Sequence, residues 1–168
     1  MTEKIHQSQQ RAMWLCLFAA FMLAFFYWFK PPISLAYDPH VEKCLPDLHL
    51  ALLVHFTPST IKREDYVFWK PAGALNYIKQ EFVLKRVMGI PGDHLQIKDG
   101  IVKINNSIVA SGFSLLDNKK IHVSAFARDE VIPPGHVFMV GTHPRSNDSR
   151  YWGYLKTQDI VGRGYKIF

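Results

Sequence analysis

The sequence predicts a mostly β domain attached to a single N-terminal transmembrane helix. An uncharged apolar run from Ala12 to Phe29 predicts the helix. Short segments rich in β-branched and aromatic residues, separated by Gly, Pro, Asn and Asp, predict the strands. With 168 residues, the chain is long enough for one domain with its own core and an appendage.

The apolar run divides the chain into three parts. Residues 1–11 form a polar tail, residues 12–29 an anchor and residues 31–168 the β domain. A helix over 12–29 spans ~27 Å, enough to cross a thin bilayer. Trp14 and Trp28, near its two ends, are typical of the aromatic belts of membrane helices. A cleaved signal peptide is the alternative, but large aromatic residues stand where it needs small ones, which favours a retained anchor.

Turn residues separate the strands that we expect within the β domain. Residues 33–48 lead into the first strand, and residues 111–132 have little periodicity and are interpreted as a loop. Asp99-Gly100 is the signal of a type I′ hairpin. The predicted strands cover residues 49–56, 66–69, 82–88, 95–98, 101–104, 108–110, 136–140 and 162–167.

Composition argues against several classes of function. The formal net charge is +6, but no basic run or nucleic-acid-binding motif accompanies it, so we expect no nucleic-acid partner. The two cysteines lie far apart and form no disulfide framework. The eight histidines show no ligand spacing, so we expect no metal and no cofactor. Composition leaves the oligomeric state unknown, and the charges flanking the anchor leave its orientation open.

Lys85 is the first candidate for chemistry, because it lies within an apolar strand. Alternation places Val83, Lys85 and Val87 on one face of that strand. A buried lysine loses hydration of its charged form and can therefore act as a general base near neutral pH. The alternative is a solvated lysine at a strand edge, whose stem covers apolar surface.

Two segments together resemble motifs of the type I signal peptidase family (S26), which are serine-lysine endopeptidases. Residues 85–93, Lys-Arg-Val-Met-Gly-Ile-Pro-Gly-Asp, are similar to the family's lysine motif. Residues 146–153, Ser-Asn-Asp-Ser-Arg-Tyr-Trp-Gly, are similar to its last motif, in the right order and at a plausible spacing. The resemblance implies that Lys85 is the catalytic base. It also implies a turn that supports the site, formed by Gly89, Pro91, Gly92 and Asp93.

The resemblance gives the last motif a supporting role. Ser146 is expected to hydrogen-bond the amine of Lys85 and to orient it. Asp148 and Arg150 are expected to form a buried ion pair. Such a pair is costly to break, because removal of one partner leaves the charge of the other buried and unpaired. The segment Gly141-Thr142-His143 departs from the family's Gly-Asp-Asn. The alternative interpretation is a polar loop with surface charges.

The nucleophile of the site has two candidates, Ser34 and Cys44. The family has a serine shortly after the anchor, followed by an x-Pro pair. Ser34 follows the anchor but lacks this proline, whereas Cys44-Leu45-Pro46 keeps the spacing with cysteine in place of serine. The distance from Cys44 to the charged residues 62–65 also resembles the conjugative-transfer (TraF-type) branch, which usually has Arg-Gly-Asp there. Cys44 is therefore preferred over Ser34.

The chemistry allows either residue. A thiol ionises more readily than a hydroxyl, so a cysteine-lysine pair can rest partly as thiolate and ammonium. As a purely structural residue, Cys44 would be a small buried hydrophobe and Ser34 an ordinary turn hydroxyl. The departure from serine is also compatible with a domain that has lost catalysis.

The resemblance implies a single-pass endopeptidase of the inner (cytoplasmic) membrane, with its catalytic domain on the periplasmic side. Its expected partner is a secreted precursor protein or a prepilin of conjugation or type IV secretion, whose product is released or cyclised. One alternative is an inactive, membrane-tethered scaffold in a secretion or pilus assembly. Another is a self-cleaving protein similar to LexA-like repressors, but the anchor and the lack of a preceding helix-turn-helix segment argue against it.

Overall fold

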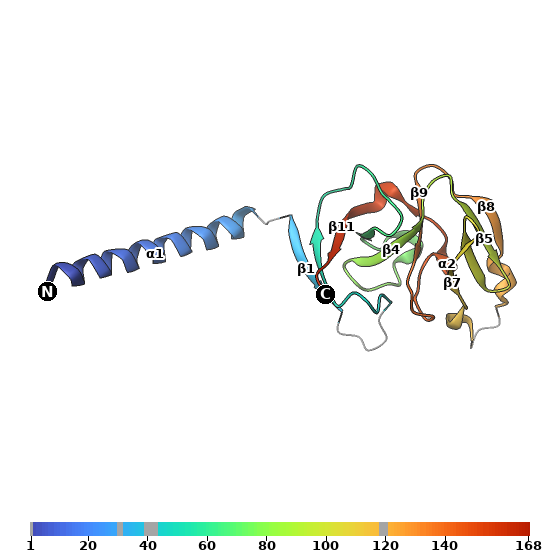
Figure 1. The fold of residues 1–168 in the computed structure, drawn as a ribbon, viewed down its shortest axis with the longest axis horizontal. Helices are drawn as coiled ribbons and strands as arrows, with labels where there is room; N and C mark the ends of the chain where they lie inside the picture. Colours follow the sequence, from blue (N-terminus) through green and yellow to red (C-terminus); the bar gives the residue numbers. More distant parts are fainter. Residues whose placement is uncertain (1, 30–31, 39–43, 118–120) are drawn as a thin grey trace. The chain divides into compact units, whose positions relative to one another are not determined.

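The computed structural model describes residues 2–29, 32–38, 44–117 and 121–168. The chain forms two compact units, residues 1–32 and 33–168. The first unit contains helix α1 (Thr2–Phe29), drawn in blue in Figure 1. Its part from Gln9 to Phe29 is long and apolar enough to cross a membrane.

The second unit is mostly β and is built around an antiparallel sheet. Among the described residues this sheet has seven strands, in the order β1-β2-β11-β3-β4-β9-β10. Strand β4 lies inside the sheet, where it pairs with β3 and β9. The strands are β1 (Ile33–Tyr37), β2 (Leu50–Val54), β3 (Tyr66–Trp69), β4 (Val83–Gly89), β9 (His136–Val140), β10 (Leu155–Lys156) and β11 (Ile160–Lys166).

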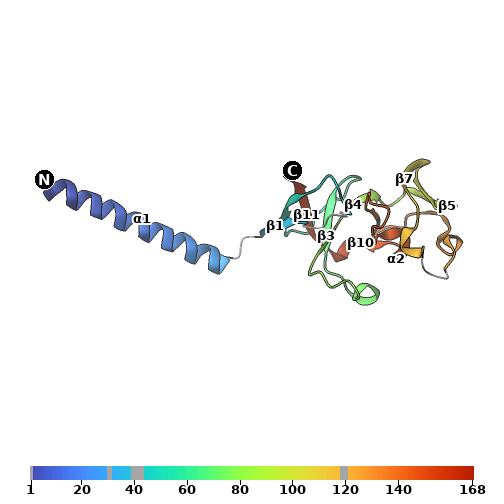
Figure 2. The same ribbon diagram turned by 90° about the horizontal axis from the view of Figure 1, so that it is seen from below.

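A smaller antiparallel sheet lies at the end of this unit away from β1, as Figures 1 and 2 show. Its described strands have the order β7-β6-β5-β8. They are β5 (His94–Lys98), β6 (Ile101–Ile104), β7 (Ser107–Ser111) and β8 (Arg128–Val131). Asp99 and Gly100 have φ angles of 50° and 77°, which confirms the left-handed turn expected between β5 and β6.

Short helical turns complete the unit. Helix α2 (Ser149–Trp152) lies within the last motif, and its N-cap is Asp148, whose side chain accepts a hydrogen bond from the backbone N–H of Arg150. The 3-10 turns are η1 (Gly73–Leu75), η2 (Ser114–Leu116), η3 (Val123–Phe126) and η4 (Thr157–Asp159).

All eight predicted strands are present, and the structure adds β1, β8 and the short β10. Strands β1 and β8 lie in segments where the sequence predicts a connection and a loop. Strand β1 pairs with β2 along its whole length, from Ile33 opposite Val54 to Tyr37 opposite Leu50. Strand β8 is largely polar and pairs with β5 at the edge of the small sheet. Edge strands are stabilised on one side only, and a polar one carries little periodic signal.

The alternation expected around Lys85 is confirmed. Lys85 and Val87 are buried, at 4% and 0% exposure, while Leu84 and Arg86 on the other face are half-buried. Val87 belongs to a core cluster that includes Val67, from the neighbouring strand β3. The alternative of a solvated lysine at a strand edge is therefore wrong.

Candidate active site

Lys85 is held in the middle of β4 with its amine directed at the last motif. Its Nζ donates a hydrogen bond of 2.9 Å to Oγ of Ser146, which is itself fully buried. In the sheet, Lys85 lies opposite Val67 of β3. A short hydroxyl in a dry setting gives the amine one fixed direction, as a general base requires.

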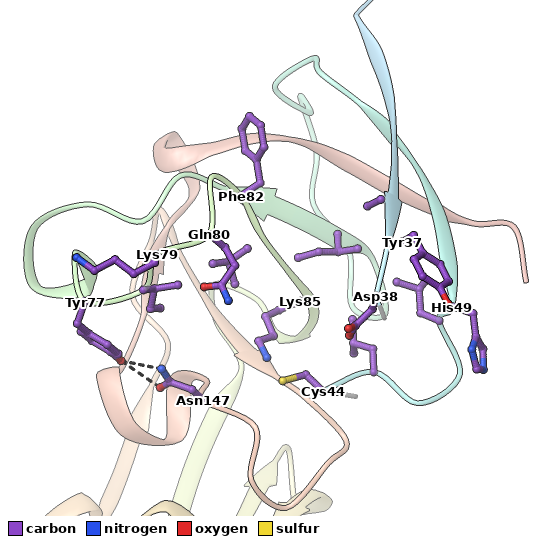
Figure 3. Close-up of a pocket in the computed structure, with 16 residues that line it drawn as sticks. Tyr37, Asp38, Cys44, His49, Tyr77, Lys79, Gln80, Phe82, Lys85 and Asn147 are labelled. Carbon is purple, nitrogen blue, oxygen red and sulfur yellow. Dashed lines mark hydrogen bonds between the residues drawn. The ribbon is translucent and has the colours of Figure 1, made fainter. Parts of the chain in front are cut away.

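A cavity of about 690 Å³ opens beside this lysine. Its walls come from β1 and the residue after it, from the segment that begins at Cys44, from the connection between β3 and β4, and from the last motif. Figure 3 shows the amine of Lys85 and the sulfur of Cys44 turned toward each other in the middle of this cleft. The amine of Lys85 and the thiol of Cys44 therefore share one cleft.

The loop before the last motif fixes Cys44. The carbonyl of Cys44 accepts a hydrogen bond of 3.4 Å from the backbone N–H of His143. Gly141 lies so close that a Cβ there would be 2.8 Å from the Cys44 carbonyl oxygen and 2.7 Å from Cβ of Ser146. Although Thr142-His143 departs from the family pattern, its backbone still brings the cysteine and the serine together.

Ser34 has different surroundings. Its Oγ lies 2.7 Å from Nε2 of His55, and Ser34 does not line the cleft. The His55 ring packs edge-on against the rings of Phe68 and Phe82, with centroids 5.0 and 5.5 Å away. The structure thus brings Cys44, Lys85 and Ser146 together. It places Ser34 in contact with His55, the residue that follows β2.

Asp148 and Arg150 form a buried ion pair, as the resemblance to the family implies. The two residues are 0% and 2% exposed, and their side chains are joined by two hydrogen bonds of 2.8 Å. Asp148 also accepts a bond of 2.9 Å from the N–H of Gly141, and Arg150 donates to the carbonyls of His143 and Ser146. Burial alone would lower the pKa of Arg150, but the carboxylate of Asp148 outweighs it and raises the pKa. The pair fixes the backbone that carries Ser146.

The turn after β4 is organised around Asp93. This buried carboxylate accepts hydrogen bonds from the N–H of Ile90 at 2.9 Å, from Nδ2 of Asn105 at 2.8 Å and from Nε of Arg63 at 2.8 Å. Burial alone would raise the pKa of Asp93, but these bonds and the charge of Arg63 lower it. Arg63 is a supporting residue that the sequence analysis missed, because its contact depends on a turn 30 residues away.

The glycines of this turn meet different demands. Gly92 has a φ of +88°, a conformation that favours glycine. Gly89 ends β4 and packs against the side chain of Ile132. Pro91 stands between them in the turn.

Two further residues of the cleft wall, Tyr77 and Asn147, escaped the sequence analysis. Tyr77 belongs to a connection without periodic pattern, and its contact with Asn147 joins positions 70 residues apart in the sequence. Among the described residues, no three His, Cys, Asp or Glu side chains gather in a way that could hold a metal ion.

Comparison with known proteins adds independent findings. The family model described as "Signal peptidase, peptidase S26" matches residues 8–168. Signal peptidase I of Bacillus caldolyticus is 34% identical over an alignment of 97 residues, with a coverage of 51% of this chain and 52% of the relative. The conjugal transfer protein TraF of Agrobacterium fabrum is 31% identical over 86 residues, covering 51% of this chain and 48% of TraF.

Two more comparisons extend this picture. Signal peptidase I of Leptolyngbya laminosa is 33% identical over 119 residues, covering 68% of this chain and 55% of the relative. A crystal structure of a signal peptidase I from Enterococcus faecalis V583 aligns with a TM-score of 0.40 and 22% identity, over 62% of this chain and 97% of that one. The chain spans about half the length of the curated relatives it matches.

Proposed function

Because this chain belongs to the peptidase S26 family of signal peptidases, we propose that it is a membrane-anchored endopeptidase that cleaves a precursor protein. Helix α1 is its anchor, and the β unit carries the site. One observation carries the proposal. The buried amine of Lys85 is hydrogen-bonded to Ser146, and it faces the thiol of Cys44 in an open cleft, as Figure 3 shows for Lys85 and Cys44.

In this proposal Cys44 is the nucleophile and Lys85 the general base. The thiol proton passes to Nζ of Lys85, and the thiolate sulfur attacks the carbonyl carbon of the peptide bond. When the tetrahedral intermediate collapses, the C–N bond breaks and the Lys85 ammonium returns its proton to the leaving amine. Lys85 then removes a proton from water, whose oxygen attacks the carbonyl carbon of the thioester. The C–S bond breaks, the carboxylic acid product leaves, and the Lys85 ammonium returns its proton to the sulfur of Cys44.

The supporting residues hold Cys44 and Lys85 in position. Ser146 orients the amine, and the Asp148–Arg150 pair holds the backbone of Ser146 and, through Gly141, the loop that touches Cys44. The turn around Asp93 fixes the end of β4 beyond Lys85. A misplacement of about 1 Å costs about 100-fold in rate, so we expect loss of these supports to reduce the rate measurably.

A finer part of the proposal concerns the substrate. The similarity to TraF of Agrobacterium fabrum, together with the position of Cys44, favours the conjugative-transfer branch. The substrate would then be a prepilin, processed on the periplasmic side of the inner membrane. The mass of the product distinguishes a released linear chain from a cyclised one, because cyclisation removes one water.

The test is the processing of a co-expressed prepilin candidate and of a secreted precursor with a cleavable signal peptide. The variants are Lys85→Ala, Cys44→Ala and Ser34→Ala, with Cys16→Ala as a matched control that removes a thiol from α1. We expect processing to be lost with Lys85→Ala and Cys44→Ala and kept with Ser34→Ala and Cys16→Ala. Each variant's accumulation and melting temperature show whether it folds.

Two other outcomes would change the assignment. Loss of processing with Ser34→Ala but not with Cys44→Ala would make Ser34 the nucleophile and Cys44 structural. If wild type processes neither precursor, or if folded Lys85→Ala and Cys44→Ala variants process them normally, the proposed dyad is wrong. A non-enzymatic scaffold would then be the better account.

A further inference from the structure

A contact between Tyr77 and Asn147 lies at one end of the cleft. The phenol of Tyr77 donates a hydrogen bond of 3.1 Å to Oδ1 of Asn147, and Nδ2 of Asn147 donates one of 2.9 Å to the phenol oxygen. Both residues line the cleft, although 70 positions separate them in the sequence. In Figure 3 they lie at the opposite end of the cleft from Tyr37 and His49, with Lys85 between the two ends.

The two partners differ in how firmly they are held. Asn147 stands between Ser146 and Asp148, which are both fully buried, so its backbone is fixed by the site itself. Tyr77 belongs to the connection between β3 and β4, and its side chain is 57% exposed. None of the three core clusters of the described residues includes Tyr77. Its hydrogen bond to Asn147 therefore ties a surface connection to the rigid wall of the site.

We propose that this contact, called here the clasp, sets the size of the substrate side chain that is accepted beside the scissile bond. The inference rests on the proposed function, because it concerns peptides held at Cys44. With the clasp closed, the phenol ring of Tyr77 and the amide of Asn147 bound the cleft next to the reacting pair. A bulky side chain at that position must displace the ring and break the hydrogen bond.

The expected change in preference for the size of the substrate side chain is large enough to measure. A neutral, partly exposed hydrogen bond shifts an equilibrium by about threefold to tenfold, which is what loss of the hydroxyl alone should change. Removal of the whole ring opens space for several methylene groups, and pocket size discriminates by about 10- to 200-fold. The hydroxyl and the ring should therefore give graded effects in the same direction.

The experiment uses the full-length protein in detergent micelles, with a precursor that the wild-type protein cleaves. Alanine, leucine or phenylalanine is placed at each of three positions before and two positions after the cleaved bond. The values of kcat and KM are measured for wild type, Tyr77→Phe, Tyr77→Ala and Asn147→Ala. Tyr165→Phe is the matched control, since Tyr165 is half exposed on β11 and does not line the cleft.

At one position of the panel, we expect Tyr77→Ala to raise kcat/KM for phenylalanine relative to alanine by about 10- to 100-fold. Tyr77→Phe and Asn147→Ala should raise the same ratio by about threefold to tenfold, and Tyr165→Phe should leave it unchanged. A clasp that only supports the fold would instead lower the melting temperature and reduce kcat/KM by the same factor for every substrate.

The outcomes separate this inference from the proposed function. If wild type cleaves the precursor and Cys44→Ala does not, but the size ratios of the clasp variants stay at the wild-type value, the clasp alone is overturned. If wild type cleaves nothing, or Cys44→Ala cleaves normally, the proposed function has failed and the clasp fails with it.

Discussion

Lys85 and Ser146 are 61 residues apart in the sequence, yet they share a buried hydrogen bond of 2.9 Å. In Ser146→Ala the amine would lose this acceptor and its fixed direction toward Cys44. We expect kcat to fall about 100-fold and the free energy of unfolding to fall by about 1–3 kcal/mol. Single-turnover cleavage and urea denaturation measure the two effects separately. Unchanged kcat in a destabilised variant would show that Ser146 is only a structural residue.

The Asp148–Arg150 pair should dominate the stability of the site. Asp148→Ala would leave the buried guanidinium of Arg150 without its partner, at a cost of about 3–5 kcal/mol in the free energy of unfolding. Glu81→Ala is a suitable control, because Glu81 forms an exposed ion pair of 3.8 Å with Lys70. That variant should change stability by less than about 1 kcal/mol.

The measurement for this pair is denaturation in urea with the full-length protein in micelles. The double variant Asp148→Ala/Arg150→Met removes both charges and should regain part of the loss. Equal stability of wild type and Asp148→Ala would contradict the buried pair as the support of the loop.

Gly141 is expected to tolerate no side chain. In Gly141→Ala the new Cβ would lie 2.8 Å from the carbonyl oxygen of Cys44 and would overlap Ser146, so the cysteine and the serine must move apart. We expect activity to fall at least about 100-fold and stability to fall by about 1–3 kcal/mol. The assays are precursor cleavage and thermal unfolding.

Gly135→Ala provides the comparison for this effect. Gly135 has a φ of +73° but open space around its Cα, so alanine there brings backbone strain without a clash. It should cost about 1 kcal/mol of stability and leave cleavage intact. Equal activity losses in the two variants would show that the position of Gly141 between Cys44 and Ser146 has no special role.

Much of the scaffold around the site could be predicted from local sequence. The alternation of residues in β4 predicts that Lys85 shares a face with Val83 and Val87, although the pattern alone leaves open whether that lysine is buried or solvated. The structure buries Lys85 and Val87. The turn at Asp99-Gly100 follows from residues that adopt positive φ. These features depend on a few neighbouring residues, so their patterns are visible in the chain.

Other features depend on contacts between distant segments, which local patterns do not record. The bond of Arg63 to Asp93 and the contact of Tyr77 with Asn147 each need the finished fold. The same holds for Ser34: position after the anchor makes it a candidate nucleophile, whereas the pairing of β1 with β2 places it beside His55. The segment before Cys44, residues 39–43, lies outside the described residues.

Stability should fall in acid through Asp93. Its pKa is lowered in the folded protein, because the bonds from Arg63, Ile90 and Asn105 outweigh the cost of burial. A carboxylate with a lowered folded pKa contributes stability that is present above its unfolded pKa, about 3.9, and is lost as pH falls through the folded pKa. Asp93→Asn should therefore flatten the dependence of unfolding free energy on pH below about 4. An unchanged slope in chemical denaturation at pH 2–5 would argue against this role of Asp93.

Glu64 is a non-glycine residue in the left-handed backbone region, and its contacts offset the strain of that conformation. Its φ of +73° disfavours a side chain, and the branch that this segment resembles usually has glycine between the arginine and the aspartate. Two contacts keep Glu64 in place: an ion pair of its side chain with Arg86 and a backbone hydrogen bond of 2.8 Å from its N–H to the carbonyl of Val87. The ion pair is partly exposed and contributes at most about 1 kcal/mol.

Glycine and alanine at position 64 should therefore differ. Glu64→Ala loses the ion pair and keeps the strain, whereas Glu64→Gly loses the ion pair and relieves the strain, so the glycine variant should be more stable by about 1 kcal/mol. Chemical denaturation at low and high salt separates the two contributions, because salt weakens only the ion pair. The difference between glycine and alanine should persist at high salt, while the difference between wild type and alanine shrinks. Equal stability of the two variants at both salt concentrations would mean that the backbone at position 64 relaxes when the carboxylate is removed.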